Sequence, residues 1–76
     1  MKVGDKVILI KGSYAPSPSN PFQETEFACQ GIIDRIDDCS LRNFIYVLWN
    51  NEHHNCYNKE ELKLVVTLNK QQLNNL

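Results

Sequence analysis

The residues best suited to metal or nucleophilic chemistry are three cysteines and two histidines, Cys29, Cys39, His53, His54 and Cys56. A structural zinc site usually contains two close ligand pairs of the Cys-x-x-Cys kind. Cys29 and Cys39 are ten residues apart, and the close pair is His54-x-Cys56. This spacing argues against zinc and favours cysteines that act as small, buried or half-buried hydrophobic residues. We therefore predict no bound metal and no cofactor.

A cysteine nucleophile with a histidine base is the second chemistry to consider. On one strand, His54 and Cys56 would share a face while His53 would point the other way. A catalytic thiol also needs a lowered pKa, an orienting third group and a pocket. A chain of 76 residues has only a thin core and no room for a deep cleft between lobes. We therefore expect a protein that is not an enzyme.

Length and composition predict one small domain. The chain is 42% hydrophobic with a net charge of −1, and it lacks the run of about 18 apolar residues that a membrane span needs. Residues 1–5 include charges too early for a secretory signal. Three cysteines leave an odd thiol and are too few for a disulfide framework. These features predict a cytoplasmic protein with reduced thiols.

The apolar and β-branched pattern predicts five strands, at residues 5–11, 25–37, 43–49, 53–57 and 62–66. Gly31, inside the second strand, suggests a bulge or sharp bend. Turns are expected at 37–40 and 50–52, and Asn58 is expected to cap one helical turn. Residues 12–23 contain three prolines, which forbid a helix and predict a long, partly extended loop.

This order of elements indicates an all-β fold, and it resembles a single five-stranded SH3-like barrel. Barrel closure removes the exposed sheet edges that a sandwich of this length would have. The barrel is expected to span residues 1–66. Residues 67–76 form a short C-terminal tail in which Leu68, Leu73 and Leu76 are spaced as one helical face. Such a short helix is ordered only if it docks.

Several barrel families resemble parts of the chain. Residues 31–37, followed by 44–49, are similar to the glycine-bulged strand pair of the photosystem I PsaE-type barrel. Val-Gly-Asp-Lys-Val at 3–7, together with 58–65, resembles the variable chain of ferredoxin–thioredoxin reductase. That chain also has a Tyr- and Pro-containing loop where residues 14–21 stand.

The hairpin sequence at 46–51, with Tyr57 and Glu-Glu-Leu at 60–62, looks like the Mind bomb-type domain and the Tudor group. Together the resemblances cover residues 3–65. What these families share implies a non-catalytic role, in which the domain docks onto a protein, a modified tail or a nucleic acid.

Strand alternation sorts the side chains into inward and outward sets. The inward set is expected to be Val7, Leu9, Ile33, Ile36, Ile45, Val47 and Trp49. The outward positions are then Ile8, Ile10, Ile32, Tyr46 and Leu48, whereas the resembling families commonly carry polar residues there. A contiguous apolar surface on the order of several hundred Å² usually marks an interface. Either the C-terminal tail covers this surface, or a protein partner or a second copy of the chain does.

Aromatic residues supply a second candidate surface. Tyr14 and Phe22 flank the proline loop, and Trp49 and Tyr57 lie on the strongest hairpin. In Tudor-like barrels, aromatics at comparable places hold methylated Lys or Arg by cation–π attraction, and in other barrels a Tyr-lined loop faces proline-rich peptides. We expect Trp49 in the core and Tyr14, Phe22 and Tyr57 in exposed contacts, because loops carry recognition.

The predicted function is that of a non-catalytic protein-binding adaptor, accessory subunit or small effector of the kind that phage and bacterial proteins often are. A nucleic-acid-binding barrel of KOW or Tudor type is the alternative. Eight Lys and Arg against nine Asp and Glu give no basic excess for phosphate contacts, which argues against it. The predicted contact residues are Tyr14, Phe22, Ile8, Ile10, Ile32, Tyr46, Leu48 and Tyr57.

Overall fold

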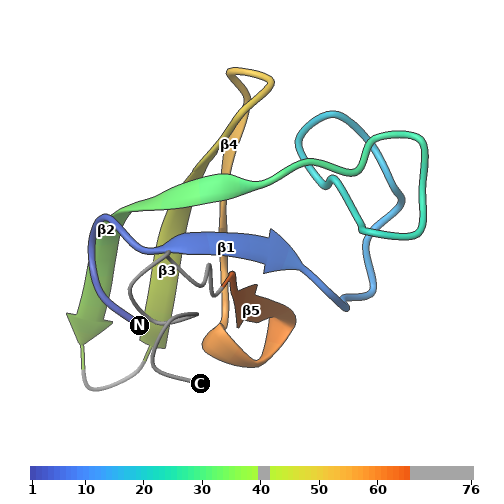
Figure 1. Ribbon diagram of the computed structural model, residues 1–76. Coiled ribbons are helices and arrows are strands. Elements are labelled where there is room, and N and C mark those ends of the chain that lie inside the picture. Colours follow the sequence, from blue (N-terminus) through green and yellow to red (C-terminus); the bar gives the residue numbers. More distant parts are fainter. Residues whose placement is uncertain (40–41, 66–76) are drawn as a thin grey trace, which may run out of the picture.

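Five antiparallel strands form one sheet in the computed structural model, which describes residues 1–39 and 42–65 (Figure 1). The strands are β1 (Lys6–Leu9), β2 (Gly31–Cys39), β3 (Arg42–Trp49), β4 (His54–Tyr57) and β5 (Leu62–Leu64). A 3-10 helix, η1 (Lys59–Glu61), precedes β5. The expected all-β class and five-stranded sheet are confirmed.

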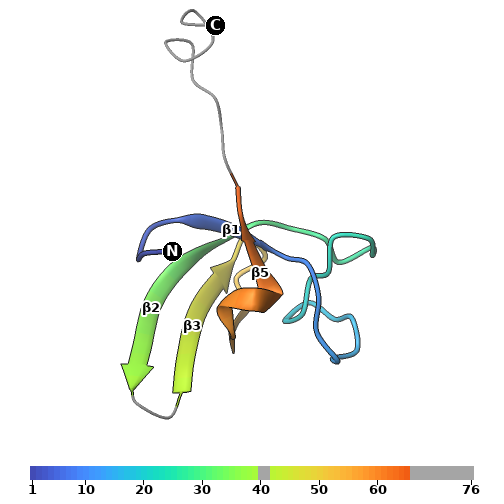
Figure 2. The same cartoon turned by 90° about the horizontal axis from the view of Figure 1, so that it is seen from below.

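The strands lie in the order β4-β3-β2-β1-β5, so the last strand in sequence pairs with the first. The long pairing of β2 with β3 bends away from the other strands and reaches past the N-terminus (Figure 2). At the opposite end of the sheet from this β2–β3 extension, the long segment between β1 and β2 extends beyond the strands (Figure 2). β2 is the central strand, and β1 lies between β2 and the edge strand β5.

One face of the sheet holds the core. Its buried members come from all five strands and are Val7, Leu9, Ile33, Ile45, Val47, Trp49, Tyr57 and Leu62. The partly buried Ile36 packs against them. Every predicted inward residue therefore lies at the core, including Trp49, which is 1% exposed. Alternation predicted these faces because a strand has only two.

The second strand differs from the prediction at both ends. It begins at Gly31 rather than at residue 25, because residues 22–28 form hydrogen-bonded turns instead. It continues through the expected turn to Cys39. Of that turn, Ser40 lies outside the described residues, as do Val66 and the predicted tail at 67–76.

The predicted bulge at Gly31 is wrong. The register shift lies between Ile33 and Arg35, at Asp34, whereas Gly31 pairs regularly with Trp49 and Val7. A Cβ atom at Gly31 would stand 2.5 Å from Val47 Cγ1 and 2.6 Å from Trp49 Cε3. Glycine is needed at position 31 because the core packs directly against its backbone.

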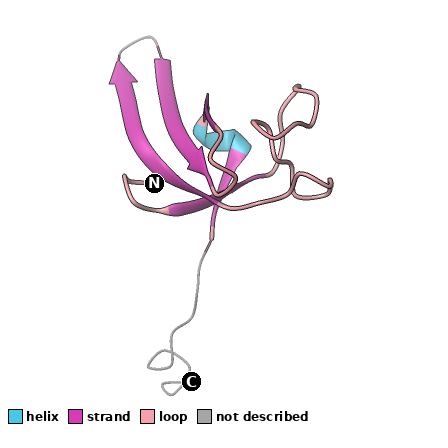
Figure 3. Cartoon of the chain, turned by 90° about the horizontal axis from the view of Figure 1, so that it is seen from above, coloured by secondary structure: helices cyan, strands magenta, loops and turns pink. Residues whose placement is uncertain are grey.

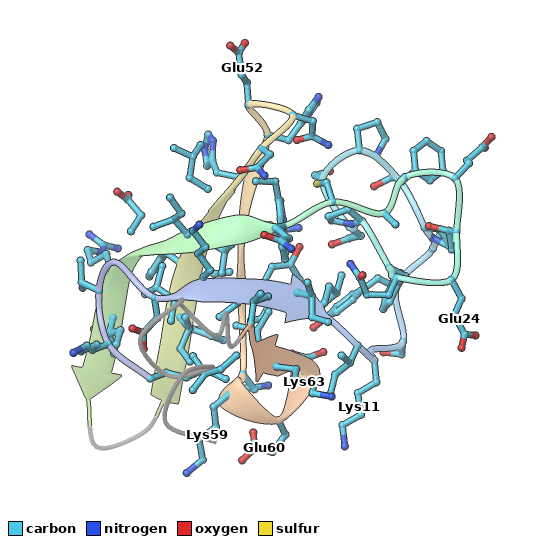
Figure 4. The ribbon with its side chains drawn as sticks, viewed as in Figure 1. Lys11, Glu24, Glu52, Lys59, Glu60 and Lys63 are labelled. Carbon is cyan, nitrogen blue, oxygen red and sulfur yellow. The ribbon has the colours of Figure 1, made fainter. Side chains whose placement is uncertain are left out.

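Two short connections complete the frame. In the β3–β4 turn, Glu52 adopts a φ of 73° at the hairpin tip (Figure 4), where Asn had been expected. Asn51 contributes through its side chain, whose Oδ1 accepts the His53 N–H at 3.0 Å. At η1, as expected, Asn58 precedes the helical turn, and its N–H donates to Glu61 Oε1 at 3.0 Å.

Among the described residues no helix has the length and apolar character needed to cross a membrane.

Candidate functional site

The segment between β1 and β2 folds as a long loop beyond the end of β1 (Figure 3). The predicted proline loop is therefore confirmed, and it is longer than expected, since no strand interrupts it before Gly31. Phe22 forms an isolated bridge with Leu9, and Ser17 forms one with Asn20. The first bridge holds the loop against β1, where Phe22 packs on the core, and the second closes a turn within the loop.

Side chains of the β3–β4 hairpin hold the loop by polar contacts. Asn51 Nδ2 donates to the Pro18 carbonyl oxygen at 2.7 Å, and Asn55 Nδ2 donates to Asn20 Oδ1 at 2.9 Å. The Tyr57 hydroxyl donates to the Ser19 carbonyl oxygen at 2.6 Å. Sequence reasoning missed this network, because its partners are separated by 33 to 38 residues and no local pattern pairs them.

Four aromatic rings run in contact from the core to the surface. Trp49 meets Tyr57 edge-on at 5.7 Å between ring centroids, and Trp49 Nε1 donates to the Tyr57 hydroxyl at 3.1 Å. Tyr14 meets Tyr57 edge-on at 6.0 Å and stacks on Phe22 at 6.4 Å. Such contacts fix ring orientation as well as burying area. The sequence named all four residues, but their order from inside to outside comes from the fold.

Tyr14 and Phe22, the last two rings of this series, line a hollow of about 490 Å³. The residues around it are Ile10, Gly12, Tyr14, Pro16, Phe22, Gln23, Glu24 and Thr25. Of these, Ile10, Tyr14 and Phe22 are predicted contact residues, and the loop brings them together. Glu24 is the charged member of the lining, and it projects outward from the loop (Figure 4). The lining of the hollow thus combines apolar and aromatic side chains with polar ones, including one carboxylate.

Tyr14 is exposed yet held in place. It is 40% exposed, while its ring contacts Phe22 and Tyr57. A hydrogen bond to the Glu61 side chain raises the pKa of the Tyr14 phenol, and desolvation acts in the same direction. A Cβ at Gly12 would lie 2.5 Å from the Tyr14 ring, so the ring fits only because residue 12 is glycine. Tyr14 therefore presents a fixed aromatic surface to solvent.

Tyr57 does not have the exposed position predicted for it. Its side chain is 1% exposed, beneath Tyr14 and beside Trp49. Burial raises its pKa to about 12, although hydrogen bonds from Trp49 and Asn55 act against this rise. The prediction failed because Ile45 stands opposite Tyr57 on β3, which places both on the core face. Tyr57 therefore supports the loop from within the core.

The outward stripe predicted from alternation is present on the opposite face of the sheet. Ile32 and Leu48 stand directly opposite one another and are 43% and 47% exposed. Ile8 and Tyr46 are partly buried on neighbouring positions, and the Arg35 guanidinium lies 4.2 Å from the Tyr46 ring centroid. Ile10 leaves this stripe, because it lies past the end of β1 and lines the hollow instead.

The cysteines and histidines do not form a cluster in the part of the chain that the structure describes. His54 and Cys56 share the outer face as expected, opposite Leu48 and Tyr46. Cys29 packs against the core and, like Cys56, is a free thiol. Within residues 1–39 and 42–65, no group of three His, Cys, Asp or Glu side chains could hold a metal ion.

Comparison with protein-family models, with curated proteins and with solved structures finds no match to this chain. The site must therefore be interpreted from its own geometry.

Proposed function

We propose that the chain is a non-catalytic protein-binding module, an adaptor, accessory subunit or small effector built on an SH3-like barrel. The observation that carries this proposal is the exposed but fixed ring of Tyr14 in the loop hollow. Tyr is enriched among residues that dominate binding energy, since it offers a large apolar area and loses little conformational entropy. Contacts that hold the ring before binding reduce that cost further.

The shape of the hollow favours an extended peptide segment of the partner. It is an open depression of about 490 Å³ between the loop and the end of β1, within the range of about 300–1,000 Å³ typical of ligand sites. The lining residues Ile10, Tyr14 and Phe22 suit apolar side chains of a peptide. Pro16 and Gln23 also line the hollow. Hydrogen bonds from Asn51 and Asn55 hold residues 18–20 of the loop against the β3–β4 hairpin.

The remaining features agree with this role. The free thiols Cys29 and Cys56 fit a reducing compartment, so we place the protein in the cytoplasm. The outer-face residues Ile8, Ile32, Tyr46 and Leu48 form a second contact surface. Nucleic-acid binding has less support, since the chain has nine acidic side chains and eight Lys and Arg, whereas phosphate contacts need cations in excess.

A display selection with matched variants tests the proposal. Random peptides would be selected on the immobilised full chain, and the affinities of enriched peptides would be measured by fluorescence polarisation. We expect Tyr14→Ala to weaken the peptides that occupy the hollow by about tenfold or more, as loss of an anchoring aromatic does. Tyr14→Phe keeps the ring and is expected to retain most of the affinity.

Tyr46→Ala is the matched control, because it removes a tyrosine ring from the opposite face. It should leave hollow-binding peptides unchanged. A selection that yields no binding peptide, or only peptides indifferent to Tyr14→Ala, would contradict a peptide site in the hollow.

A further inference from the structure

Two carboxylates lie at the hollow beside Tyr14. Glu24 is the charged residue of the lining, and its neighbours Gln23 and Thr25 are polar but neutral. The second carboxylate belongs to Glu61 of η1, whose Oε2 atom is 2.9 Å from the position that a Cβ of the lining residue Gly12 would take. The charged groups that a ligand meets in the hollow are therefore negative.

Lys11 is the cation nearest to these carboxylates along the chain, but it does not line the hollow. Its two neighbours, Ile10 and Gly12, are lining residues, whereas Lys11 itself is not. Figure 4 shows the Lys11 and Glu24 side chains extending from separate parts of the loop. In the described part of the chain, Lys11 forms no ion pair with Glu24 or Glu61. The negative charge at the hollow is thus not neutralised by an ion pair with Lys11.

The segments around the hollow are also acidic as a group. The loop at residues 10–30 and η1 together contain four glutamates and two lysines, a net charge of −2, against −1 for the whole chain. Lys63, the cation of β5, stands opposite Ile8 on the outer face of the sheet and is not a lining residue. A cationic ligand is therefore attracted to this end of the molecule and an anionic one is repelled.

Tyr14 and Phe22 add aromatic surfaces to this acidic hollow. Their rings are stacked at 6.4 Å between centroids with 27° between the planes, and Tyr14 is 40% exposed. A hydrogen bond to the Glu61 side chain raises the pKa of Tyr14, and desolvation and the Glu61 charge act in the same direction. The Tyr14 ring therefore lies in the field of a carboxylate. The face of such a ring attracts a cation, and more strongly once the cation loses water.

We propose that the hollow binds its partner peptide through a basic side chain, Lys or Arg. The cation lies against the Tyr14 ring and pairs with the Glu24 carboxylate. The aliphatic stem of the same side chain packs on Ile10 and Phe22. Glu61 adds attraction while it keeps its hydrogen bond to Tyr14. The inference rests on the proposed peptide-binding function and names the ligand chemistry that the hollow selects.

Other ligands suit the hollow less well. An acidic peptide or the phosphates of a nucleic acid would lie beside Glu24 and Glu61, and the like charges would repel. A wholly apolar peptide would pack on Ile10 and the two rings, but it would take water from the Glu24 carboxylate without supplying a partner, which costs free energy. For a metal ion, no group of three His, Cys, Asp or Glu side chains within residues 1–39 and 42–65 could hold it.

The test uses peptides that are selected on the full chain and that lose affinity with Tyr14→Ala. We expect each to contain a Lys or Arg whose replacement by its neutral counterpart, norleucine or citrulline, weakens binding by about tenfold. Glu24→Gln removes the charge of the lining and keeps its size, so it should weaken the same peptides by about two- to fivefold, the range of an exposed ion pair. Their affinity should also fall as salt rises.

Glu52→Gln is the matched control, because it makes the same change of charge at the tip of the β3–β4 turn, where the side chain points away from the loop (Figure 4). It should leave the affinities unchanged. Equal weakening by Glu24→Gln and Glu52→Gln would overturn the inference, since the net charge of the molecule would then explain the effect. Denaturant unfolding should show wild-type stability for both variants, because both side chains are exposed.

The two proposals fail in different ways. Peptides that depend on Tyr14 but contain no basic residue, or tolerate its neutralisation, support a peptide site in the hollow and refute a basic ligand. A selection in which no peptide depends on Tyr14 refutes both. Peptides that need Tyr14, a basic residue and Glu24, but not Glu52, support both.

Discussion

Two tyrosines in contact have opposite roles in this protein. Tyr57 is 1% exposed and donates to the Ser19 carbonyl oxygen, whereas Tyr14 rests on it and is 40% exposed. Sequence reasoning placed both at the surface, because both neighbour turns or loops. The difference arises from β-strand register, which places Tyr57 opposite Ile45. The buried ring supports the exposed one, so Tyr57 contributes to the hollow without reaching a ligand.

The buried phenol predicts a loss of stability at alkaline pH. The pKa of Tyr57 is about 12 in the folded protein, against about 10 for an unfolded chain. Its stabilising contribution is complete below pH of about 10, where both states keep the proton. Between about 10 and 12 the unfolded chain releases the proton first, so the free energy of unfolding falls as pH rises. The raised pKa of Tyr14 adds in the same direction.

Urea unfolding at several pH values through that window measures the effect. Tyr57→Phe loses the hydrogen bonds to Ser19 and Trp49, so it should be less stable throughout. Its free energy of unfolding should nevertheless fall less steeply above pH of about 10. The same slope in wild type and Tyr57→Phe would show that Tyr57 titrates as an exposed phenol.

At the scale of elements, β2 can pack against the core only because Gly31 has no side chain. Gly31 pairs with Trp49 and Val7, and the core occupies the space where a Cβ would stand. The sequence marked this glycine as special but suggested a bend. A glycine required for close packing cannot be distinguished from one required for a bulge without knowing which strand lies against it. The bulge itself falls at Asp34, a residue with no local signal for one.

We predict that Gly31→Ala destabilises the protein by about 1–3 kcal/mol, as overpacking of a filled core does. The new methyl group would press on Val47 Cγ1 and Trp49 Cε3, both within 2.6 Å of its position. Ile32→Ala is the control on the next residue, whose side chain is 43% exposed, and it should cost less. Denaturant unfolding measures both variants. A Gly31→Ala protein as stable as wild type would show that β2 can move away from β3.

The loop between β1 and β2 is the element that the sequence described least. Its prolines excluded a helix, and that expectation holds. Its path depends on Asn51, Asn55 and Tyr57, which bond to residues 18–20 across 33 to 38 positions of sequence. Contacts between residues so far apart leave no periodic pattern in the sequence from which they could be predicted. The hollow is a consequence of this path, so its existence could not be predicted although three of its lining residues were.

At the scale of the whole molecule, a thin core leaves two surfaces available for contact. Strand alternation predicted that Ile8, Ile32, Tyr46 and Leu48 face away from the core, and their positions in the sheet agree. The hollow lies at the loop end, where Tyr14 and Phe22 meet. Two surfaces of different chemistry on one small domain are consistent with the proposed protein-binding role.

We predict that Leu48→Glu combined with Tyr46→Ser leaves the fold intact and abolishes binding at the outer face. Leu48 is 47% exposed and Tyr46 lies on the same face under Arg35, so neither change creates a buried charge. Circular dichroism and denaturant unfolding should show a native sheet with a free energy of unfolding within about 1 kcal/mol of wild type, as surface changes usually do. Unfolding of the double variant would mean that this face is covered in the native protein.

The sequence by itself determined that there are five strands, which residues of β1, β2 and β3 face the core, and the outward apolar stripe. Each of these follows from local propensity and from a period of two, which neighbouring residues express without reference to distant ones. The tertiary structure decided which residues meet. It buried Tyr57 under Tyr14, moved Ile10 into the hollow, and set Lys6, Lys63, His54 and Arg35 opposite the stripe. These are matters of register and loop path, which depend on contacts between residues far apart in the chain.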